Sequence, residues 1–323
     1  MNVPAPRIVV AINRAASFGR YRSVGQDAVE AIRAAGFDAV GVTAPNFELL
    51  RRETAAAMRP DDHALVVVGG DGMVSMGVNL VAETPVPLGI VSTGTGNDAA
   101  RSLALPFDDP DASIAVLLRA LLRQARVIDA GRIRHGGLST WFIGAVSAGF
   151  DAIVNERANR MSWPRGPSRY TFALLRELIT LRPIAYDLVV DGAPSKVEAL
   201  LISVANAESI GGGMRIVPDA ELDDGLLDLF IVAPMSRRAF LRVFPKVYSG
   251  AHTDLAEVHI ERARSVRISA AGIVAMADGE RVGSLPVEID VVPGALRVLA
   301  PHLDVVNERP PSALGENVTG PAV

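Results

Sequence analysis

The stretch GGDG at residues 69–72 follows a run of β-branched residues and precedes an apolar segment, MVSMGVNLV. Asp-Gly between apolar segments can form a tight β-hairpin turn. The segment that follows lacks the alternation of a strand and is long enough for a helix, so a helix is the better prediction. Consecutive glycines before a helix let backbone N–H groups approach a phosphate, and the helix adds its positive end. A strand-to-helix turn without a ligand stays open, because GGDG alone does not distinguish the two.

A second glycine-rich loop, GTGND at residues 94–98, follows the next apolar strand, VPLGIV. With Ala99 it matches the GxGxxA pattern of dinucleotide-binding folds, but that pattern belongs after the first strand of a βαβ unit. Here it follows the fourth expected strand. Two glycine loops at neighbouring strand ends are therefore better interpreted as two walls of one crevice. The loop NRAASFGR at 13–20 ends the first strand and is expected to lie beside them.

Two acidic turns stand out in the second half of the chain. Asp223-Asp224-Gly225 precedes an apolar strand, and Asp278-Gly279-Glu280 follows another. Asp-Gly is turn chemistry wherever it occurs, so each stretch can be a simple surface turn. In the second stretch two carboxylates stand one residue apart, and their repulsion would raise the pKa of one of them.

The elements that must position these residues change character near residue 126. Before it, apolar strands at 7–13, 38–43, 64–68 and 86–91 alternate with helices, which predicts a parallel sheet covered on both faces. Helices are expected at 47–58, 73–82, through 103 and from Asp109-Pro110, and a helix from Ser23 is expected to begin with a capping box that includes Gln26.

After residue 126 strands follow one another, which predicts a mainly antiparallel, sandwich-like second domain. Asp191-Gly192 has the signal of a hairpin turn. The expected strands are 138–146, 184–190, 196–205, 226–232, 264–270, 273–277 and 287–299, with helices at 168–182 and 236–248. The predicted domains are thus a nucleotide-binding α/β domain at 1–126 and a β-rich domain at 127–301, followed by a largely disordered tail at 302–323.

Composition excludes several classes of function. The chain has 323 residues with a net charge of −4, which gives no reason to expect a nucleic-acid partner. Its lack of cysteine excludes disulfides and thiolate metal sites, and fits a cytoplasmic protein. No signal peptide or transmembrane segment is expected. No lysine follows a glycine, so the P-loop signature is absent.

GGDG, GTGND and Arg101 together resemble the catalytic domain of the diacylglycerol kinase family, which includes sphingosine and ceramide kinases and soluble bacterial lipid kinases. The resemblance continues through SAGFDAIVN at 147–155, NAESIGGGMRIVPDAELDDGLLDL at 206–229, ADGERV at 277–282 and PGALRVLAP at 293–301. It is strongest to the bacterial branch and covers nearly the whole chain except the tail. It implies a two-domain fold with the active site between the domains, and NAD kinases are relatives that share GGDG.

The resemblance implies that ATP lies in the glycine crevice and that Mg²⁺ takes part. Glu280 is implied as the residue that accepts the proton of the lipid hydroxyl, with Asp278 beside it. Asp71 is implied to contact a magnesium ion or its water shell. A further magnesium ion is implied on Asp224, with backbone oxygens at the positions of Glu221 and Leu226. The implied nucleotide contacts are Asn13, Thr43, Gly69, Gly70, Asp71, Gly72, Met73, Val74, Ser75, Met76, Gly94, Thr95, Gly96, Asn97 and Asp98.

The expected function is therefore that of an ATP-dependent lipid kinase, with diacylglycerol as the acceptor and phosphatidic acid as the product. The family pattern after GGDG is Thr, an apolar residue, Asn and Glu, whereas this chain has Met73-Val74-Ser75-Met76, and Arg14 replaces a proline. An NAD kinase-like enzyme and a non-catalytic nucleotide- or lipid-binding regulator are the alternatives. Asp71 has a second interpretation as the cap of the helix that follows it.

A lipid acceptor implies a peripheral contact with the inner face of the membrane. The stretch RANRMSWPRGPSRY at 157–170 is basic and aromatic and is a candidate for that contact, although a solvated helix and loop is the simpler interpretation. The sequence does not determine the oligomeric state, and a homodimer is left open.

Overall fold

The computed structural model describes residues 4–13, 23–150, 152–154, 157, 161, 176–177 and 182–301. The first four strands lie parallel in the order β2-β1-β3-β4, as expected from their continuous apolar runs. Their bounds are β1 (Arg7–Ile12), β2 (Asp38–Val42), β3 (Ala64–Gly69) and β4 (Leu88–Ser92). The helices that connect and flank them are α1 (Val24–Ala34), α2 (Phe47–Ala57), α3 (Asp71–Val81), α4 (Asp98–Ser102) and α5 (Pro110–Leu121).

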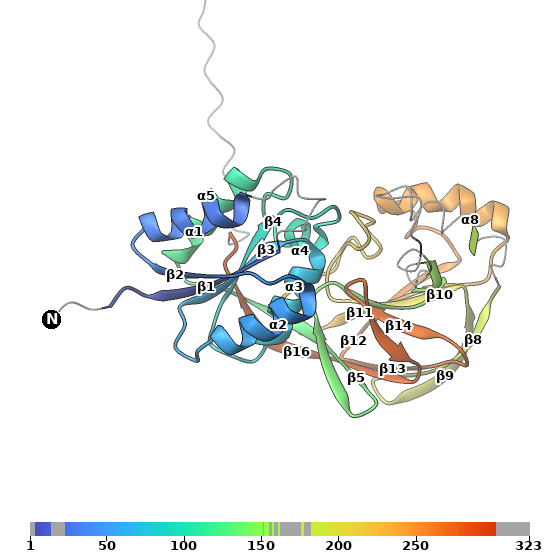
Figure 1. Ribbon diagram of the computed structural model, residues 1–323. Helices are drawn as coiled ribbons and strands as arrows, with labels where there is room; N and C mark the ends of the chain where they lie inside the picture. Colours follow the sequence, from blue (N-terminus) through green and yellow to red (C-terminus); the bar gives the residue numbers. More distant parts are fainter. Residues whose placement is uncertain are drawn as a thin grey trace, which may run out of the picture.

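Helices cover both faces of this parallel sheet (Figure 1). Successive residues of a strand point to opposite faces, and the two hydrophobic clusters follow that rule. Ile8 and Val10 pack with α1 and α5, whereas Val9 and Ala11 pack in the cluster that contains α3. Each strand is therefore buried on both sides, which is why its sequence is apolar without interruption.

The remaining strands form the second half of the molecule. In chain order they are β5 (Arg126–His135), β6 (Leu138–Phe142), β7 (Ala145–Gly149), β8 (Ile184–Val190), β9 (Ala193–Ala199), β10 (Leu201–Ala205), β11 (Leu227–Val232), β12 (Val258–Ala263), β13 (Ser265–Ser269), β14 (Val274–Ala277), β15 (Glu280–Ser284) and β16 (Val287–Val298). A sheet in the order β12-β11-β10-β7-β14-β15 has antiparallel neighbours throughout.

The long strand β16 joins the two halves. Its end pairs in parallel with β4 through Val298 and Leu88, and its first part pairs antiparallel with β13. In the described part of the chain, one sheet thus runs in the order β2-β1-β3-β4-β16-β13-β8-β9, with β5 also on β16 and β6 on β5. The second sheet packs against the C-terminal half of this one. The apolar side chains between them make a β-sandwich, as expected.

Some local predictions are confirmed. Asp109 caps α5 by accepting hydrogen bonds from the N–H groups of Asp111 and Ala112, with Pro110 in the first turn. Asp191 and Gly192 join β8 to β9 with φ of 45° and 85°, as a type I′ hairpin requires. The segment expected to be a helix at 236–248 forms α8 (Arg237–Val243) and the 3-10 helix η2 (Phe244–Tyr248).

Other local predictions are wrong. The expected capping box of α1 is absent: Ser23 has helical dihedrals and makes no side-chain cap, and Gln26 donates to Glu30. The single strands expected at 138–146 and 196–205 are each split in two, and the parts belong to different sheets.

Three predictions concern segments outside the described residues, wholly or largely. These are the helix at 168–182, the tail at 302–323 and the basic aromatic stretch at 157–170. Across the residues that the structure does describe, no helix combines the length and apolar character needed to cross a membrane.

Candidate active site

The two glycine loops meet at one edge of the parallel sheet. Parallel neighbouring strands end at the same edge, so Asn13 after β1, Thr43 after β2, Gly70 after β3 and Gly94 after β4 lie together there. The loops touch: a Cβ on Gly70 would lie 3.0 Å from the Cα of Gly94. The two glycine loops are therefore adjacent at this edge of the sheet, as their places after neighbouring strands predicted.

Asp71 ties the two loops to each other. Its Oδ2 accepts a hydrogen bond from the N–H of Asn97 and its Oδ1 one from the N–H of Asp98, both 2.8 Å long. These are the first N–H groups of α4, so Asp71 caps α4 and not α3, which it begins. Burial and the neighbouring charge of Asp98 raise the pKa of Asp71, and the N–H donors partly oppose that rise.

Glycine is required where the loops approach Asp71. A Cβ on Gly96 would lie 2.6 Å from Asp71 Oδ2. The side chain of Asn97 shapes the same loop, because it accepts from the N–H of Gly94 and donates to the carbonyls of Gly94 and Phe107. The side chain of Asn97 is thus engaged within the protein, whereas Thr95 is exposed.

Asp98 connects the GTGND loop to the second half of the molecule. Its carboxylate accepts hydrogen bonds from the N–H of Gly212, at 2.8 and 3.0 Å, and from that of Gly213, at 2.8 Å. Both glycines have positive φ, at 85° and 96°, which favours glycine at these positions. The three consecutive glycines at 211–213 were the sequence signal for this contact, and they were not identified as site residues.

Asp278 organises the turn between β14 and β15. Its carboxylate accepts three hydrogen bonds, from the N–H groups of Ile143 (3.0 Å), Gly144 (2.9 Å) and Ala145 (3.1 Å). Its own backbone is left-handed, with φ of 46°. Burial raises the pKa of Asp278 to about 6 despite these donors.

Glu280 brings the acidic turn to the first glycine loop. It is exposed at the start of β15, and a Cβ on Gly72 would lie 3.3 Å from its Oε1. A carboxylate oxygen of the second half therefore stands directly beside the N-terminus of α3. Asp71 and Asp278 are close enough to interact electrostatically. The three predicted catalytic residues are thus brought together from segments far apart in the sequence.

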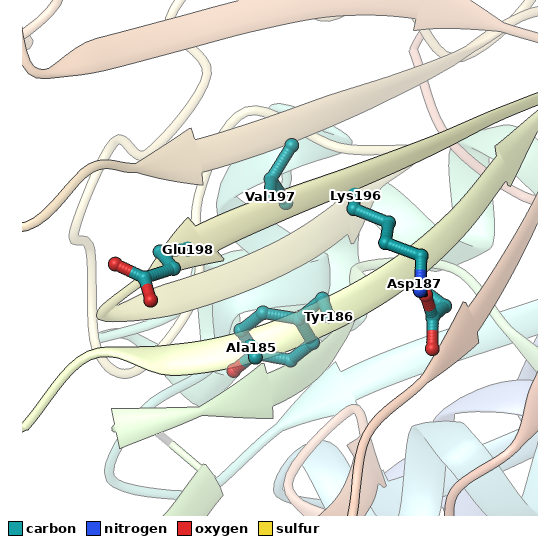
Figure 2. Close-up of a pocket in the computed structure, with 6 residues that line it drawn as sticks. All are labelled: Ala185, Tyr186, Asp187, Lys196, Val197 and Glu198. Carbon is teal, nitrogen blue, oxygen red and sulfur yellow. The ribbon is translucent and has the colours of Figure 1, made fainter.

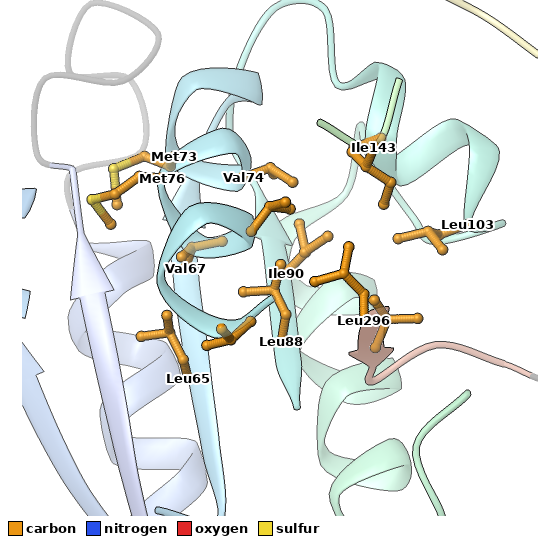
Figure 3. Packing of buried hydrophobic residues seen from close by; sticks show 14 of the residues in the cluster. Leu65, Val67, Met73, Val74, Met76, Leu88, Ile90, Leu103, Ile143 and Leu296 are labelled. Carbon is orange, nitrogen blue, oxygen red and sulfur yellow. The ribbon is translucent and has the colours of Figure 1, made fainter. Parts of the chain in front are cut away.

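Most of the side chains that follow GGDG lie in the core and not at the surface, where a nucleotide could contact them. Met73, Val74 and Met76 are buried in the core between α3 and the sheet, and only Ser75 is partly exposed (Figure 3). Met73 also packs over Gly69, where a Cβ would lie 2.9 Å from that of Met73. These three positions have only their backbone to offer a nucleotide.

Met73→Thr is expected to lower the free energy of unfolding by about 1–3 kcal/mol, because it removes buried volume and places a hydroxyl in an apolar site. The KM for ATP should change little. Urea unfolding and initial-rate kinetics measure the two effects. Met73→Leu conserves volume and should cost less than about 1.5 kcal/mol. A Met73→Thr protein of unchanged stability but altered KM would show that this side chain contacts the nucleotide.

The loop predicted to hold magnesium, at residues 221–226, lies beside Arg262 of β12. Asp224 accepts the N–H of Leu226 at 2.9 Å, and its other carboxylate oxygen lies 3.5 Å from the guanidinium of Arg262. Arg262 also lies 3.9 Å from Glu221 and 3.8 Å from Asp228. Among the described residues, no group of three or more acidic or histidine side chains could hold a metal ion. The predicted site uses one carboxylate and two backbone oxygens, so this finding does not test it, and magnesium at this loop stays a prediction from the resemblance.

Asp129 is a structural residue of the site that the sequence analysis missed. It lies buried on β5 and accepts the N–H of Gly225 at 2.7 Å and that of Gly294 at 2.8 Å. It thereby holds the acidic loop at 223–225 against the irregular part of β16 that contains Gly294. An acid within the apolar strand RVIDAGRI was the available signal, since a buried carboxylate needs donors.

A surface pocket elsewhere is separate from this site. It lies on the paired strands β8 and β9 and includes the ion pair between Lys196 and Asp187, at 3.2 Å (Figure 2). None of the predicted site residues lines it. Its lining residues are Ala185, Tyr186, Asp187, Lys196, Val197 and Glu198.

Comparisons with known proteins match both halves of the chain. Residues 7–132 match the model of the diacylglycerol kinase catalytic domain, and residues 144–300 match that of the YegS C-terminal NAD kinase beta sandwich-like domain. A protein of Mycobacterium tuberculosis named diacylglycerol kinase is 39% identical over 298 residues, covering 92% of this chain and 96% of the relative. One of that name from Staphylococcus aureus is 28% identical, covering 87% of this chain and 88% of the relative.

Solved structures support the fold. A diacylglycerol kinase structure from Bacillus anthracis has a TM-score of 0.68 at 18% identity and covers 93% of this chain and 98% of its own. An NAD kinase from Archaeoglobus fulgidus in complex with ATP has a TM-score of 0.52 at 14% identity, covering 91% of this chain and 93% of its own.

Proposed function

The chain belongs to the diacylglycerol kinase catalytic domain family, and from this premise we propose that it transfers the γ-phosphoryl group of ATP to the hydroxyl of a lipid. Diacylglycerol is the proposed acceptor and phosphatidic acid the product. The observation that carries the proposal is the position of Glu280 Oε1 beside Gly72, which sets a carboxylate against the loop suited to phosphates.

The N-terminal crevice supports ATP as the donor. Phosphate oxygens would be bound by backbone N–H groups of the glycine loops and by the positive end of α3. Gly70 and Gly94 carry no side chain, so a phosphate at this edge would meet bare backbone. ATP would be bound together with magnesium, which would neutralise charge on the transferred phosphate.

Glu280 is the proposed general base. It would accept the proton of the lipid hydroxyl while the hydroxyl oxygen forms a bond to the γ-phosphorus and the bond to the leaving oxygen of ADP breaks. Such transfer depends mainly on positioning and charge stabilisation. Asp278 is the positioning residue, because its three hydrogen bonds fix the turn that carries Glu280.

An acceptor panel tests the proposal. Purified protein is incubated with γ-labelled ATP, magnesium and, in separate reactions, diacylglycerol, sphingosine, ceramide and NAD. We expect label in phosphatidic acid. Label in NAD alone would replace the proposal with an NAD kinase activity, and label in sphingosine or ceramide alone would change the acceptor. ATP binding without transfer to any acceptor would favour a regulator.

A further inference from the structure

The segment formed by α8 and η2 concentrates positive charge. Arg237, Arg238, Arg242 and Lys246 are all exposed on it. From residue 229 to 253 the chain contains no aspartate or glutamate, although its net charge is −4. The segment is therefore a basic surface on a protein that is acidic as a whole.

One side of this segment anchors it to the second sheet. Phe240 is buried and meets Phe150 edge to face, with ring centroids 5.2 Å apart, and Phe244 stacks on Phe240 at 6.1 Å. Val247 is partly buried and packs against the same cluster. The segment lies at the outer side of the second half of the molecule (Figure 1).

The opposite side exposes apolar groups among the basic ones. Leu241 is 45% exposed and Tyr248 is 52% exposed, although the same helices bury other apolar residues. Basic side chains beside an exposed leucine and tyrosine match an interfacial surface, where cations meet anionic headgroups and apolar groups enter the acyl boundary. Tyrosine is typical of the headgroup level, because one end of its ring is apolar and the other polar.

We propose that this outward side docks on an anionic lipid bilayer. It is called the α8–η2 face below and consists of Arg237, Arg238, Leu241, Arg242, Lys246 and Tyr248. The proposal rests on the proposed function, because a lipid acceptor is presented by a membrane. Charge complementarity selects an anionic surface over a neutral one.

A short segment links the α8–η2 face to the GTGND loop. The N–H of Arg215 donates to the carbonyl of Val247 in η2, at 3.0 Å. Three residues earlier, Gly212 and its neighbour Gly213 donate to Asp98 of the GTGND loop. The ring of His252 also meets the carbonyl of Ile216, at 3.0 Å. Docking through α8 and η2 would therefore hold the crevice in a defined orientation to the bilayer.

Sedimentation with vesicles tests the proposal. Wild type is mixed with vesicles of phosphatidylcholine alone or with phosphatidylglycerol, and compared with Arg238→Glu/Arg242→Glu. A basic residue near an anionic surface contributes about fivefold to binding, so this variant should bind the anionic vesicles at least about 20-fold more weakly. The matched control is Arg52→Glu/Arg59→Glu, which makes the same change of charge on exposed residues near α2 and should retain binding.

Two results would overturn the docking face: equal binding of wild type to neutral and anionic vesicles, or unchanged binding by Arg238→Glu/Arg242→Glu. Leu241→Ala/Tyr248→Ala tests the apolar part and should also weaken binding. Thermal unfolding shows whether each variant is folded. Binding of short DNA in place of anionic vesicles would assign the face to nucleic acid.

A kinetic comparison separates this proposal from the proposed function. With a short-chain diacylglycerol dispersed as monomers, Arg238→Glu/Arg242→Glu should transfer phosphate as fast as wild type, while its rate on long-chain diacylglycerol in anionic vesicles falls at least about 20-fold. If wild type phosphorylates neither form, the proposed function fails and the sedimentation result still decides the docking face.

Discussion

Glu280→Gln is expected to lower the rate of phosphoryl transfer by about 100-fold to 10,000-fold, the usual contribution of a positioned general base. The amide cannot accept the proton of the acceptor hydroxyl, yet it keeps the shape of the side chain. Because Glu280 is exposed at the first residue of β15, the change should leave folding intact. The loss should appear in kcat, with little change in the dissociation constant for ATP. Steady-state kinetics and equilibrium ATP binding measure the two quantities.

Glu198→Gln is the matched control, since Glu198 is also an exposed strand carboxylate but lies on β9, away from the glycine loops. It should retain wild-type transfer. If wild type and Glu280→Gln both bind ATP and both show the same background rate, the protein is a regulator and not a kinase. If Glu280→Gln is as active as an active wild type, another group accepts the proton.

The parallel half of the fold was predictable because its strands are buried on both faces. A run such as ALVVV at residues 64–68 lies between a helix and a glycine loop, and in that place a buried strand is the natural interpretation. The splitting of two expected strands was not predictable from the same signal. Residues Ala199 and Leu201 are both buried, one at the end of β9 and the other at the start of β10, in different sheets. Burial in either sheet requires the same apolar residues, so the pattern does not show where a strand changes sheet.

The site was predictable as a set of residue types and not as a set of bonds. A glycine loop or an acidic turn can be recognised from a few neighbouring residues. The residues that form hydrogen bonds with it lie far along the chain. Asp98 accepts hydrogen bonds from glycines 114 and 115 residues away, and Asp129 accepts from Gly294, 165 residues away. Met73 shows the same limit, because its place in the motif does not reveal that its side chain lies in the core and that only its backbone is left to contact a nucleotide.

The acid turn at Asp278 should make the enzyme sensitive to pH near 6. Above the pKa of about 6, the carboxylate accepts the three N–H groups that fix the turn of Glu280. Below it, the proton occupies one oxygen and opposes these donors. We expect kcat/KM of wild type to fall about tenfold per pH unit below the pKa, as one protonation requires. Asp278→Asn should lower activity at pH 8 by about 10- to 100-fold, because its NH₂ group faces backbone donors. Its kcat/KM should not show the fall at acidic pH that is expected for wild type, called the acidic limb below.

The pH dependence of the free energy of unfolding tests the pKa of Asp278 independently of catalysis. Its pKa is higher in the folded protein than the ordinary value near 4, so the folded state holds the proton more tightly than the unfolded state. Its contribution to the free energy of unfolding is therefore largest at low pH and is lost as pH rises from about 4 to about 6, by up to about 3 kcal/mol. Asp278→Asn should remove that slope, while Asp38→Asn, at an exposed position, should keep it. If Asp278→Asn keeps both the acidic limb of kcat/KM and the slope of the unfolding free energy, another group causes the pH dependence. Asp278 would then only shape the turn.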